Sequence, residues 1–426
     1  MSGRGDRRVF LVVLGTHGDV LPFIALGAAL KARGYAVSLA APATFSALAA
    51  RAGLSFTPIG TQADFDRVVG TPWLWRPIRG ARLLFTAAAA AAEPVYRWLE
   101  AQCRPGIDVA VASSLAFGAR VAQDRLGLSL ATLHLMPMLV ESRLAPPRLP
   151  GLPLPDALPV GLRHWLGRGA DKVVIGPAAL PQLNAFRASL GLPPVKRLRH
   201  WWHSPQRVLL AVPGWYAPPQ PDWPVQLAQT GFPLADIHGD TDQLPPELKS
   251  FLTAGTPPLA FTYGSAMVRA NQFFATAVAV CRRLGRRGVL LAPRGEQIPD
   301  GLPTDIHHTT YAPLSRLLPA CAALIHHGGI GTVAQALAAG CPQLVVPLAF
   351  DHADEGRRVR CLGAGTTLSH WQFTPARTSR VIGKLLASDA VAVACSEVRA
   401  RMAREDGIAT ACDAVERMFV DHGCAA

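Results

Sequence analysis

The sequence predicts an α/β protein made of two doubly wound domains, each a parallel sheet covered by helices on both faces. Its 426 residues exceed one ordinary globular core. Half of the residues are hydrophobic and 17% are charged, which excludes a disordered or low-complexity chain. The third observation is that short β-rich runs alternate with helically spaced apolar residues in both halves of the chain.

The first half opens with a strand, a glycine loop and a helix. Residues 9–14 form a β-rich run that closes in the loop 15–19, and apolar residues at helical spacing follow from there to Gly34. The same pattern predicts further elements: strands at 36–40 and 109–112, and a helix at 44–52. A proline-rich stretch at 145–159 is expected to be a surface excursion of this half that contacts substrate.

The second half repeats the scheme. Its buried strands are expected at 259–262, 289–292, 323–326 and 343–346. We therefore expect an N-terminal Rossmann-like domain over 1–231, a linker rich in proline over 232–256, and a C-terminal Rossmann-like domain over 257–426. The last helix is free to pack back on the N-terminal domain. Two such domains facing one another create a cleft at the carboxyl ends of both sheets, which suits a reaction between two substrates.

Charge and cysteine content indicate partners and location. Forty-two Lys and Arg against 29 Asp and Glu give a net charge of +13, which favours anionic partners such as nucleic acid, acidic lipid or phosphorylated metabolites without choosing among them. The eight cysteines are scattered without a CxxC pair, as expected for reduced thiols in the cytoplasm. The longest apolar run, 83–92, cannot span a bilayer, so any membrane contact is expected to be peripheral, at the inner face.

The segment 323–352 carries the strongest chemical signal. A strand enters the loop His327-Gly-Gly-Ile-Gly-Thr332, and the loop opens a helix whose free amides can hold a diphosphate. His327 adds a side-chain donor and Thr332 a hydroxyl. A lone glycine loop of this kind more often only turns the chain, but a second polar loop, at 350–352, follows the next strand.

This passage resembles the donor-binding signature of family-one glycosyltransferases with the GT-B fold. The resemblance implies that His327, Gly329, Gly331 and Thr332 bind the diphosphate, that Gln335 stands at the ribose-binding Glu position, and that Asp351 and His352 meet the sugar. This chain departs from the family at two of these positions, with Gln335 for Glu and His352 for Gln. The resemblance further implies base stacking on Tyr311, main-chain contact at Ala312 and a diphosphate contact at Ser265.

The N-terminal loop Gly15-Thr-His-Gly-Asp-Val-Leu-Pro22 is similar to the acceptor-side loop of the same family. Asp19 at the tip of a strand can take the proton from an acceptor hydroxyl as a general base, with His17 beside the acceptor. The alternative role of Asp19 is to cap the helix expected from Val20. One residue can do both, and we favour catalysis.

The resemblance extends over nearly the whole sequence. It is nearest to the rhamnosyltransferase of rhamnolipid synthesis and to the sterol and antibiotic glycosyltransferases. It implies an inverting hexosyltransferase that moves a hexose or a deoxyhexose such as rhamnose and needs no cofactor and no metal. The implied co-substrate is a dTDP- or UDP-sugar and the implied acceptor is hydrophobic, such as a 3-hydroxy fatty acyl lipid, with no nucleic-acid partner.

Three alternatives remain at this point. The first is transfer of glucose from UDP-glucose to a polyketide, sterol or flavonoid-like product, and the second is a non-catalytic nucleotide- or lipid-binding protein. A nicotinamide-dependent oxidoreductase is disfavoured because residues 15–18 do not form GxGxxG.

The DxD-like pairs at 64–66 and 240–242 are rejected as metal sites, since one lies in an expected helix and the other in the linker. The segment 196–203 mixes cations with tryptophans, which suits phosphate backbones, a membrane surface or an acceptor groove, and we favour a solvated surface with two buried rings.

Overall fold

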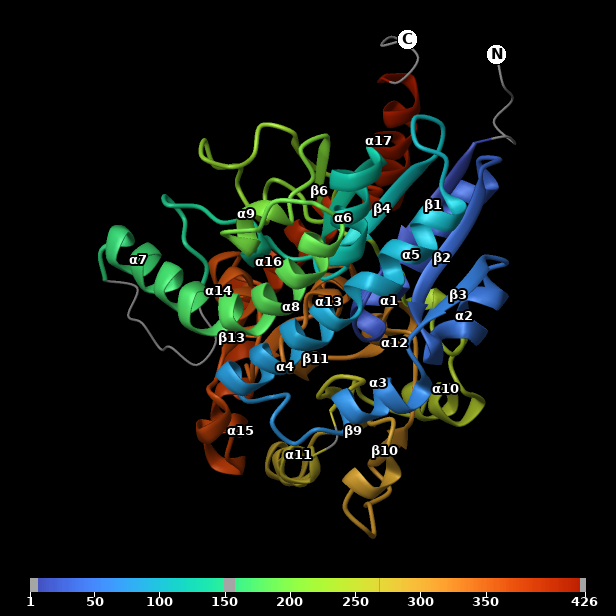
Figure 1. Cartoon of the computed structure of the whole chain (residues 1–426). Coiled ribbons are helices and arrows are strands. Elements are labelled where there is room, and N and C mark those ends of the chain that lie inside the picture. The colour runs from blue at the N-terminus through green and yellow to red at the C-terminus, as the bar shows by residue number, and fades with distance from the viewer. Residues whose placement is uncertain (1–6, 149–157, 268, 422–426) are drawn as a thin grey trace. The chain divides into compact units, whose positions relative to one another are not determined.

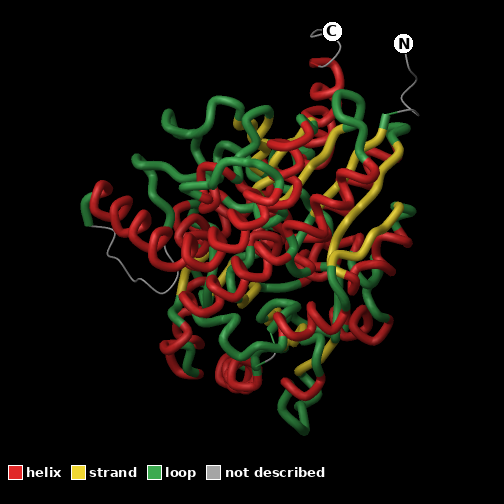
Figure 2. The backbone as a smooth tube through the Cα atoms, in the orientation of Figure 1, coloured by secondary structure: helices red, strands yellow, loops and turns green. Residues whose placement is uncertain are grey.

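A computed structural model describes residues 7–148, 158–267 and 269–421 of the chain. The chain divides into two compact units. Unit 1 has residues 1–235 and 406–426, and unit 2 has residues 236–405. Most of the excursion expected at 145–159 lies outside the described residues. Figure 1 gives the element labels used below, and Figure 2 shows the strands of each unit enclosed by helices.

Unit 1 is built on a seven-stranded parallel sheet in the order β3-β2-β1-β4-β5-β6-β7. The order reverses between β1 and β4, which is where doubly wound sheets open a binding crevice at the carboxyl ends of their strands. The strands are β1 (Arg8–Val12), β2 (Ala36–Pro42), β3 (Ser55–Ile59), β4 (Val109–Ser113), β5 (Ser129–His134), β6 (Arg207–Leu210) and β7 (Leu227–Gln229).

Helices cover both faces of this sheet. Phe10 of β1 lies in a buried cluster with Phe117 and Trp202 on one face, whereas Leu11 approaches Gly27 of the first helix on the other. The helices are α1 (His17–Ala32), α2 (Ser46–Arg51), α3 (Gln62–Val69), α4 (Pro77–Ala90), α5 (Ala92–Gln102), α6 (Phe117–Leu126), α7 (Val160–Ala170), the π-helical turn η4 (Asp171–Ile175), α8 (Gly176–Ser189), α9 (Leu198–Trp201) and α17 (Gly407–Asp421).

Unit 2 repeats the plan with a six-stranded parallel sheet in the order β10-β9-β8-β11-β12-β13. Its strands are β8 (Leu259–Thr262), β9 (Gly288–Leu291), β10 (Ile306–Thr309), β11 (Ala323–His326), β12 (Gln343–Val345) and β13 (Gly365–Thr367). Its helices are α10 (Pro246–Thr253), α11 (Asn271–Leu284), α12 (Leu314–Leu317), α13 (Ile330–Ala339), α14 (His352–Cys361), α15 (Pro375–Leu386) and α16 (Asp389–Met402). Two doubly wound parallel sheets confirm the predicted fold class.

The segment expected as a linker is partly structured. Helix α10 falls inside 232–256, and its Leu248 is fully buried in the core cluster of unit 2 beside Leu317 and Leu324. The turn at Asp236–His238 also belongs to unit 2, because the carbonyl of Asp236 accepts a hydrogen bond from the Tyr311 hydroxyl at 2.7 Å. Chain contacts therefore begin unit 2 at residue 236.

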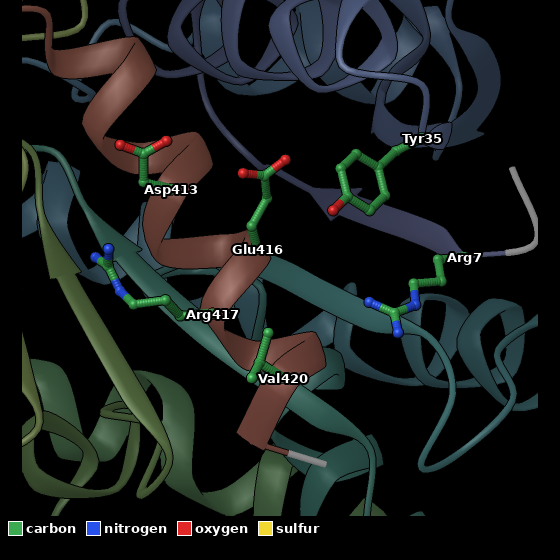
Figure 3. Close-up of a pocket in the computed structure, with 6 residues that line it drawn as sticks. All are labelled: Arg7, Tyr35, Asp413, Glu416, Arg417 and Val420. Carbon is green, nitrogen blue, oxygen red and sulfur yellow. The ribbon is translucent and has the colours of Figure 1, made fainter. Parts of the chain in front are cut away.

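The last helix, α17, packs on unit 1 rather than on the unit that precedes it in sequence. Arg33 at the end of α1 donates to Asp413 at 2.5 Å and to Glu416 at 3.0 Å, and Tyr35 stacks on Phe419 with ring centroids 5.3 Å apart. Figure 3 shows the hollow of about 360 Å³ that remains beside these contacts, lined by Arg7, Tyr35, Asp413, Glu416, Arg417 and Val420. It lies near the amino ends of β1 and β2, away from the carboxyl edge where doubly wound sheets bind ligands.

Candidate functional site

The loop between β11 and α13 forms a cradle of backbone amides at the carboxyl edge of the unit 2 sheet. Gly328 adopts a φ of +105°, and a side chain there would collide with Val345 and with the carbonyl of His352. Gly329 is the N-cap of α13, whose first-turn amides have no partner inside the helix. This geometry fits a phosphate group, because helix amino ends present N–H groups and a positive dipole.

His327 lies within this cradle. Side chains at Gly264 or Gly329 would approach its imidazole to within 3.2 Å and 2.6 Å, so both glycines make room for the ring. His327 is buried, and its Nδ1 has no hydrogen-bond partner among the described residues. Burial lowers the pKa of His327 to about 4, so the ring is neutral at pH 7 and carries one N–H. A buried nitrogen of this kind is a candidate donor to an oxygen anion.

Asp351 and His352 reach the same edge through an unusual backbone turn. Phe350 adopts a φ of +53°, a left-handed conformation that is costly for a bulky residue and that often marks a functional site. It directs the chain into α14, with Asp351 as the N-cap residue. The His352 ring lies edge-on to His327, with centroids 4.7 Å apart. The sequence placed Phe350 in this loop but did not predict its conformation, because a non-glycine residue gives no signal for positive φ.

The tautomer of His352 is set by the backbone before it. Its Nδ1 accepts hydrogen bonds from the amides of Leu348 at 3.4 Å and Ala349 at 3.3 Å. Burial holds the pKa of His352 well below its usual range. The neutral ring therefore carries its hydrogen on Nε2. A glutamine, which the resembling family has at this position, offers both a donor and an acceptor instead.

The other predicted donor residues fall into two groups. Gly331 and Thr332 lie in the first turn of α13, where a side chain added at Gly331 would meet nothing within 4 Å. Gln335 is buried one turn later in the same helix, and Ser265 is exposed in the loop after β8, next to Gly264. Because β8 is paired with β11, this loop lies beside the cradle.

Tyr311 and Ala312 follow β10, which lies in the same sheet as β11 but does not pair with it. The hydroxyl of Tyr311 donates to the carbonyl of Asp236, and the ring lies against Gly239. The carbonyl of Tyr311 accepts from Thr309 at 3.0 Å, and Ala312 is buried in the core. These contacts fix the tyrosine ring in one orientation, and base stacking on it stays a prediction.

Asp19 lies in unit 1, within the first turn of α1. The helix begins at His17, three residues earlier than expected, because Thr16 and Asp19 form a capping box. The amide of Thr16 donates to Asp19 Oδ2 at 2.8 Å. Burial raises the pKa of Asp19 to about 6 although the Thr16 hydrogen bonds oppose that shift. The capping role is thus present, and a carboxylate with this pKa also suits a general base near neutral pH.

His17 and a further polar array occupy the loops around the carboxyl edge of unit 1. The His17 ring packs edge-on against Phe45 at 5.0 Å. Ser114 Oγ lies 2.6 Å from His134 Nδ1, and His134 Nε2 lies 2.8 Å from His203 Nδ1. Sequence reasoning missed this array, because its three members come from segments far apart in the chain.

Metal-ligand geometry is lacking in the part of the chain that the structure describes, where no three His, Cys, Asp or Glu side chains could share an ion. Asp64, from the first DxD-like pair, instead accepts from Thr61 at the start of α3. No helix among the described residues is long and apolar enough to cross a membrane.

Comparisons with known proteins agree with this architecture. Residues 9–143 match the N-terminal domain of glycosyltransferase family 28, and residues 290–416 match the C-terminal domain of erythromycin biosynthesis protein CIII-like proteins. The glycotransferase of kitacinnamycin superposes with a TM-score of 0.75 at 22% identity, covering 98% of this chain and 100% of that one. Spinosyn rhamnosyltransferase SpnG, solved with thymidine diphosphate, gives 0.67 at 21% identity over 94% and 98%.

Two doubly wound units, the second with a cradle of backbone amides at its carboxyl edge, fit the GT-B fold of glycosyltransferases, in agreement with these matches. O-mycaminosyltylonolide 6-deoxyallosyltransferase of Streptomyces fradiae is 32% identical over 438 residues, covering 96% of this chain and 97% of the relative. The chain belongs to this family of antibiotic-type glycosyltransferases, which are nucleotide-sugar-dependent enzymes. The predicted enzyme class is confirmed, and the roles of the individual site residues stay predictions.

Proposed function

We propose that this enzyme transfers a deoxyhexose from a thymidine diphosphate sugar to a hydroxyl group of a hydrophobic polyketide-type natural product. The observation that carries the donor half is the buried His327 Nδ1, which has no partner among the described residues, in a cradle of helix amides. The name of the Streptomyces fradiae relative, a 6-deoxyallosyltransferase, supports a deoxyhexose, and the thymidine diphosphate complex of SpnG supports the nucleotide.

In this proposal the donor diphosphate lies against His327 and the amides of Gly331 and Thr332, with Ser265 as an additional contact. Charge grows on the leaving diphosphate during transfer, and these donors are already in place to stabilise it. Gln335 would meet the ribose, Tyr311 the base, and Asp351 and His352 the sugar hydroxyls. We expect this chemistry to need neither metal nor cofactor.

Asp19 is the proposed general base, with His17 beside the acceptor. As its carboxylate takes the proton, the acceptor oxygen attacks the anomeric carbon and the bond to the diphosphate oxygen breaks. A single displacement of this kind inverts the anomeric centre. The raised pKa of Asp19 lets it hold a proton more firmly than an ordinary aspartate, which favours proton abstraction from a hydroxyl.

The second candidate is transfer of rhamnose to a 3-hydroxy fatty acyl lipid, which rests on the sequence resemblance to the rhamnolipid enzyme. One panel of donor sugars and acceptors distinguishes these two candidate functions from each other and from the UDP-glucose alternative. Purified enzyme is incubated with dTDP-rhamnose, another dTDP-deoxyhexose or UDP-glucose, each with a macrolide aglycone, a 3-hydroxy fatty acid or a flavonoid, and products are read by mass spectrometry. We expect dTDP-sugar turnover on the macrolide aglycone. Product on the fatty acid alone would replace the polyketide proposal, and binding of nucleotide without turnover would favour a non-catalytic protein.

A further inference from the structure

Helix α7 and the π-helical turn that continues it carry apolar side chains on an exposed face. None of the residues of α7 is buried. Trp165 is 68% exposed, and Leu162 lies one turn before it on the same face. Val173 in the following turn η4 is 60% exposed. Figure 1 shows α7 at the margin of unit 1.

Helix α4 extends this face. A guanidinium nitrogen of Arg82 donates to the carbonyl of Val173 at 3.4 Å, which places α4 beside η4. Ile78 stands one turn before Arg82 on the same side of α4 and is exposed. Trp73, in the loop before α4, is half exposed and lies under the guanidinium of Arg79, 5.3 Å from its ring centroid. Helix α4 therefore lies beside η4, which continues α7, and exposed apolar side chains occur on all three elements and on the loop before α4.

We call this the α4–α7 surface. Its apolar members are Trp73, Ile78, Leu162, Trp165 and Val173, and its cations are Arg76, Arg79, Arg82, Arg163, Arg168 and Lys172. The six cations are in no ion pair with any described residue. Asp171 is the one acidic residue within 73–91 and 158–182, and it pairs with the buried Arg199 at 3.4 Å. The surface is therefore both apolar and strongly cationic.

We propose that the α4–α7 surface docks the enzyme on an anionic phospholipid bilayer. Tryptophan, leucine and isoleucine on one face suit the boundary between headgroups and acyl chains, where an amphipathic helix lies parallel to the membrane. Arginine and lysine around them reach acidic headgroups while their aliphatic stems cover apolar surface. The positive charge of the α4–α7 surface complements acidic lipid headgroups, so we expect an anionic bilayer rather than a neutral one to bind it. A surface-bound enzyme would meet a hydrophobic acceptor where that acceptor concentrates.

The segment 196–203, which the sequence also offered for a membrane surface, does not fit this role. Trp202 is fully buried in the core of unit 1. Arg197 donates to Glu141 at 2.8 Å, and Arg199 is buried against Asp171. The tryptophans and arginines of this segment are therefore used inside unit 1, although Lys196 and His200 are exposed.

The test is co-sedimentation of the full-length enzyme with vesicles. One set is pure phosphatidylcholine and the other contains one quarter phosphatidylglycerol. We expect binding to the anionic set, with much less to the neutral one, and weaker binding as salt is raised because exposed charges are screened. Replacing both Arg168→Gln and Lys172→Gln removes two charges, each worth about a fivefold change in partitioning, so binding should fall by more than about tenfold.

A second variant, Leu162→Ser with Trp165→Ser, tests the apolar half and should weaken binding by a similar factor with little change in its salt dependence. Matched controls lie in unit 2. Arg380 and Lys384 of α15 are both exposed and are four residues apart, as Arg168 and Lys172 are, and Trp371 is as exposed as Trp165. The variants Arg380→Gln with Lys384→Gln, and Trp371→Ser, should bind vesicles like the parent.

Three results would overturn the proposal. These are no binding to anionic vesicles, equal binding to neutral and anionic vesicles, and unchanged binding of both α4–α7 variants. If the parent forms a dimer that the Leu162→Ser and Trp165→Ser variant loses, without vesicle binding by either, the surface contacts a second copy instead. In denaturant titration, unit 1 of the α4–α7 variants should unfold like that of the parent, so an earlier transition would indicate misfolding rather than a membrane effect. Thymidine diphosphate affinity, which depends on unit 2, should be unchanged in every variant.

Discussion

Asp19 combines a structural and a proposed chemical role in one carboxylate. It accepts the Thr16 amide at the start of α1, and burial raises its pKa to about 6. The folded state therefore holds this proton more tightly than the unfolded state does. The resulting stabilisation is fully present below about pH 4 and is lost as the pH rises through about 6. At neutral pH the Asp19 carboxylate is charged, and its charge lowers the free energy of unfolding. This loss of stability falls on a residue that we propose to be catalytic.

The variant Asp19→Asn keeps an oxygen for the Thr16 amide and removes the charge. In the parent enzyme, kcat/KM should rise with pH to a plateau above about 6, because the base must be deprotonated. The variant should lose about 10²–10⁴-fold in kcat, and its kcat/KM should not rise with pH as that of the parent does. Its melting temperature at pH 8 should equal or exceed that of the parent. An active variant with the parent's pH profile would remove Asp19 from the mechanism.

His327 is the residue-scale test of the donor site. Loss of a hydrogen bond to a charged ligand costs about 1.5–3 kcal/mol, so His327→Ala should weaken thymidine diphosphate binding about 10–100-fold in a calorimetric titration. The exposed His370, also in unit 2, provides the control His370→Ala, with parent affinity expected. Equal affinities for all three proteins would show that His327 does not contact the phosphates.

At the scale of elements, one carboxylate joins three helices of unit 1. Asp124 of α6 accepts from Arg120 at 2.8 Å, from Arg187 of α8 at 2.6 Å and from the Trp201 indole of α9 at 2.8 Å. Burial alone would raise the pKa of Asp124, but Arg120, Trp201 and Arg187 outweigh burial and lower it. Two nearly buried guanidinium groups therefore depend on a single acidic partner.

We expect Asp124→Asn to lower the free energy of unfolding of unit 1 by about 3–5 kcal/mol, because it leaves buried charge uncompensated. The control is Asp413→Asn, which breaks an Arg–Asp pair of similar length whose acidic partner is half exposed. That change should cost less than about 1 kcal/mol. Denaturant titration measures both, and equal losses would show that burial does not govern these pairs.

At the scale of the whole molecule, the chain returns to unit 1 after completing unit 2. Phe419 of α17 is buried against Tyr35, with Arg7 5.4 Å from its ring centroid. Helix α17 thereby covers part of a sheet formed by residues hundreds of positions earlier. We therefore expect the stability of unit 1 and nucleotide binding by unit 2 to be separable properties of one chain.

The variant Phe419→Ala should destabilise unit 1 by about 3–5 kcal/mol, as for other buried aromatic side chains. Thymidine diphosphate affinity should be unchanged, since the proposed donor residues all lie in unit 2. Differential scanning calorimetry with and without the nucleotide separates these effects, because a ligand raises the transition of the unit that binds it. A loss of affinity matching the loss of stability would mean that the units unfold together.

Prediction from sequence succeeded where the signal was local. The runs at 259–262 and 323–326 are β8 and β11 with the same bounds, and the helix after the glycine loop is α13. The edge strands β3, β7, β10 and β13 were missed because they are short or only half buried, so their hydrophobic pattern is weak. The interior strands β5 and β6 were missed as well, although they are mostly buried. The start of α1 was placed three residues late, since the Thr16–Asp19 capping box was not recognised.

The sequence by itself determined the two doubly wound sheets and the loops at their carboxyl edges, because strand periodicity and glycine punctuation are encoded over a few neighbouring residues. Tertiary structure decided the rest. It buried His327 with an open nitrogen, aligned Ser114, His134 and His203, returned α17 to unit 1, and exposed the cationic face of α4 and α7. Burial, pKa and the pairing of distant side chains depend on what packs against a residue, and local sequence does not contain that information.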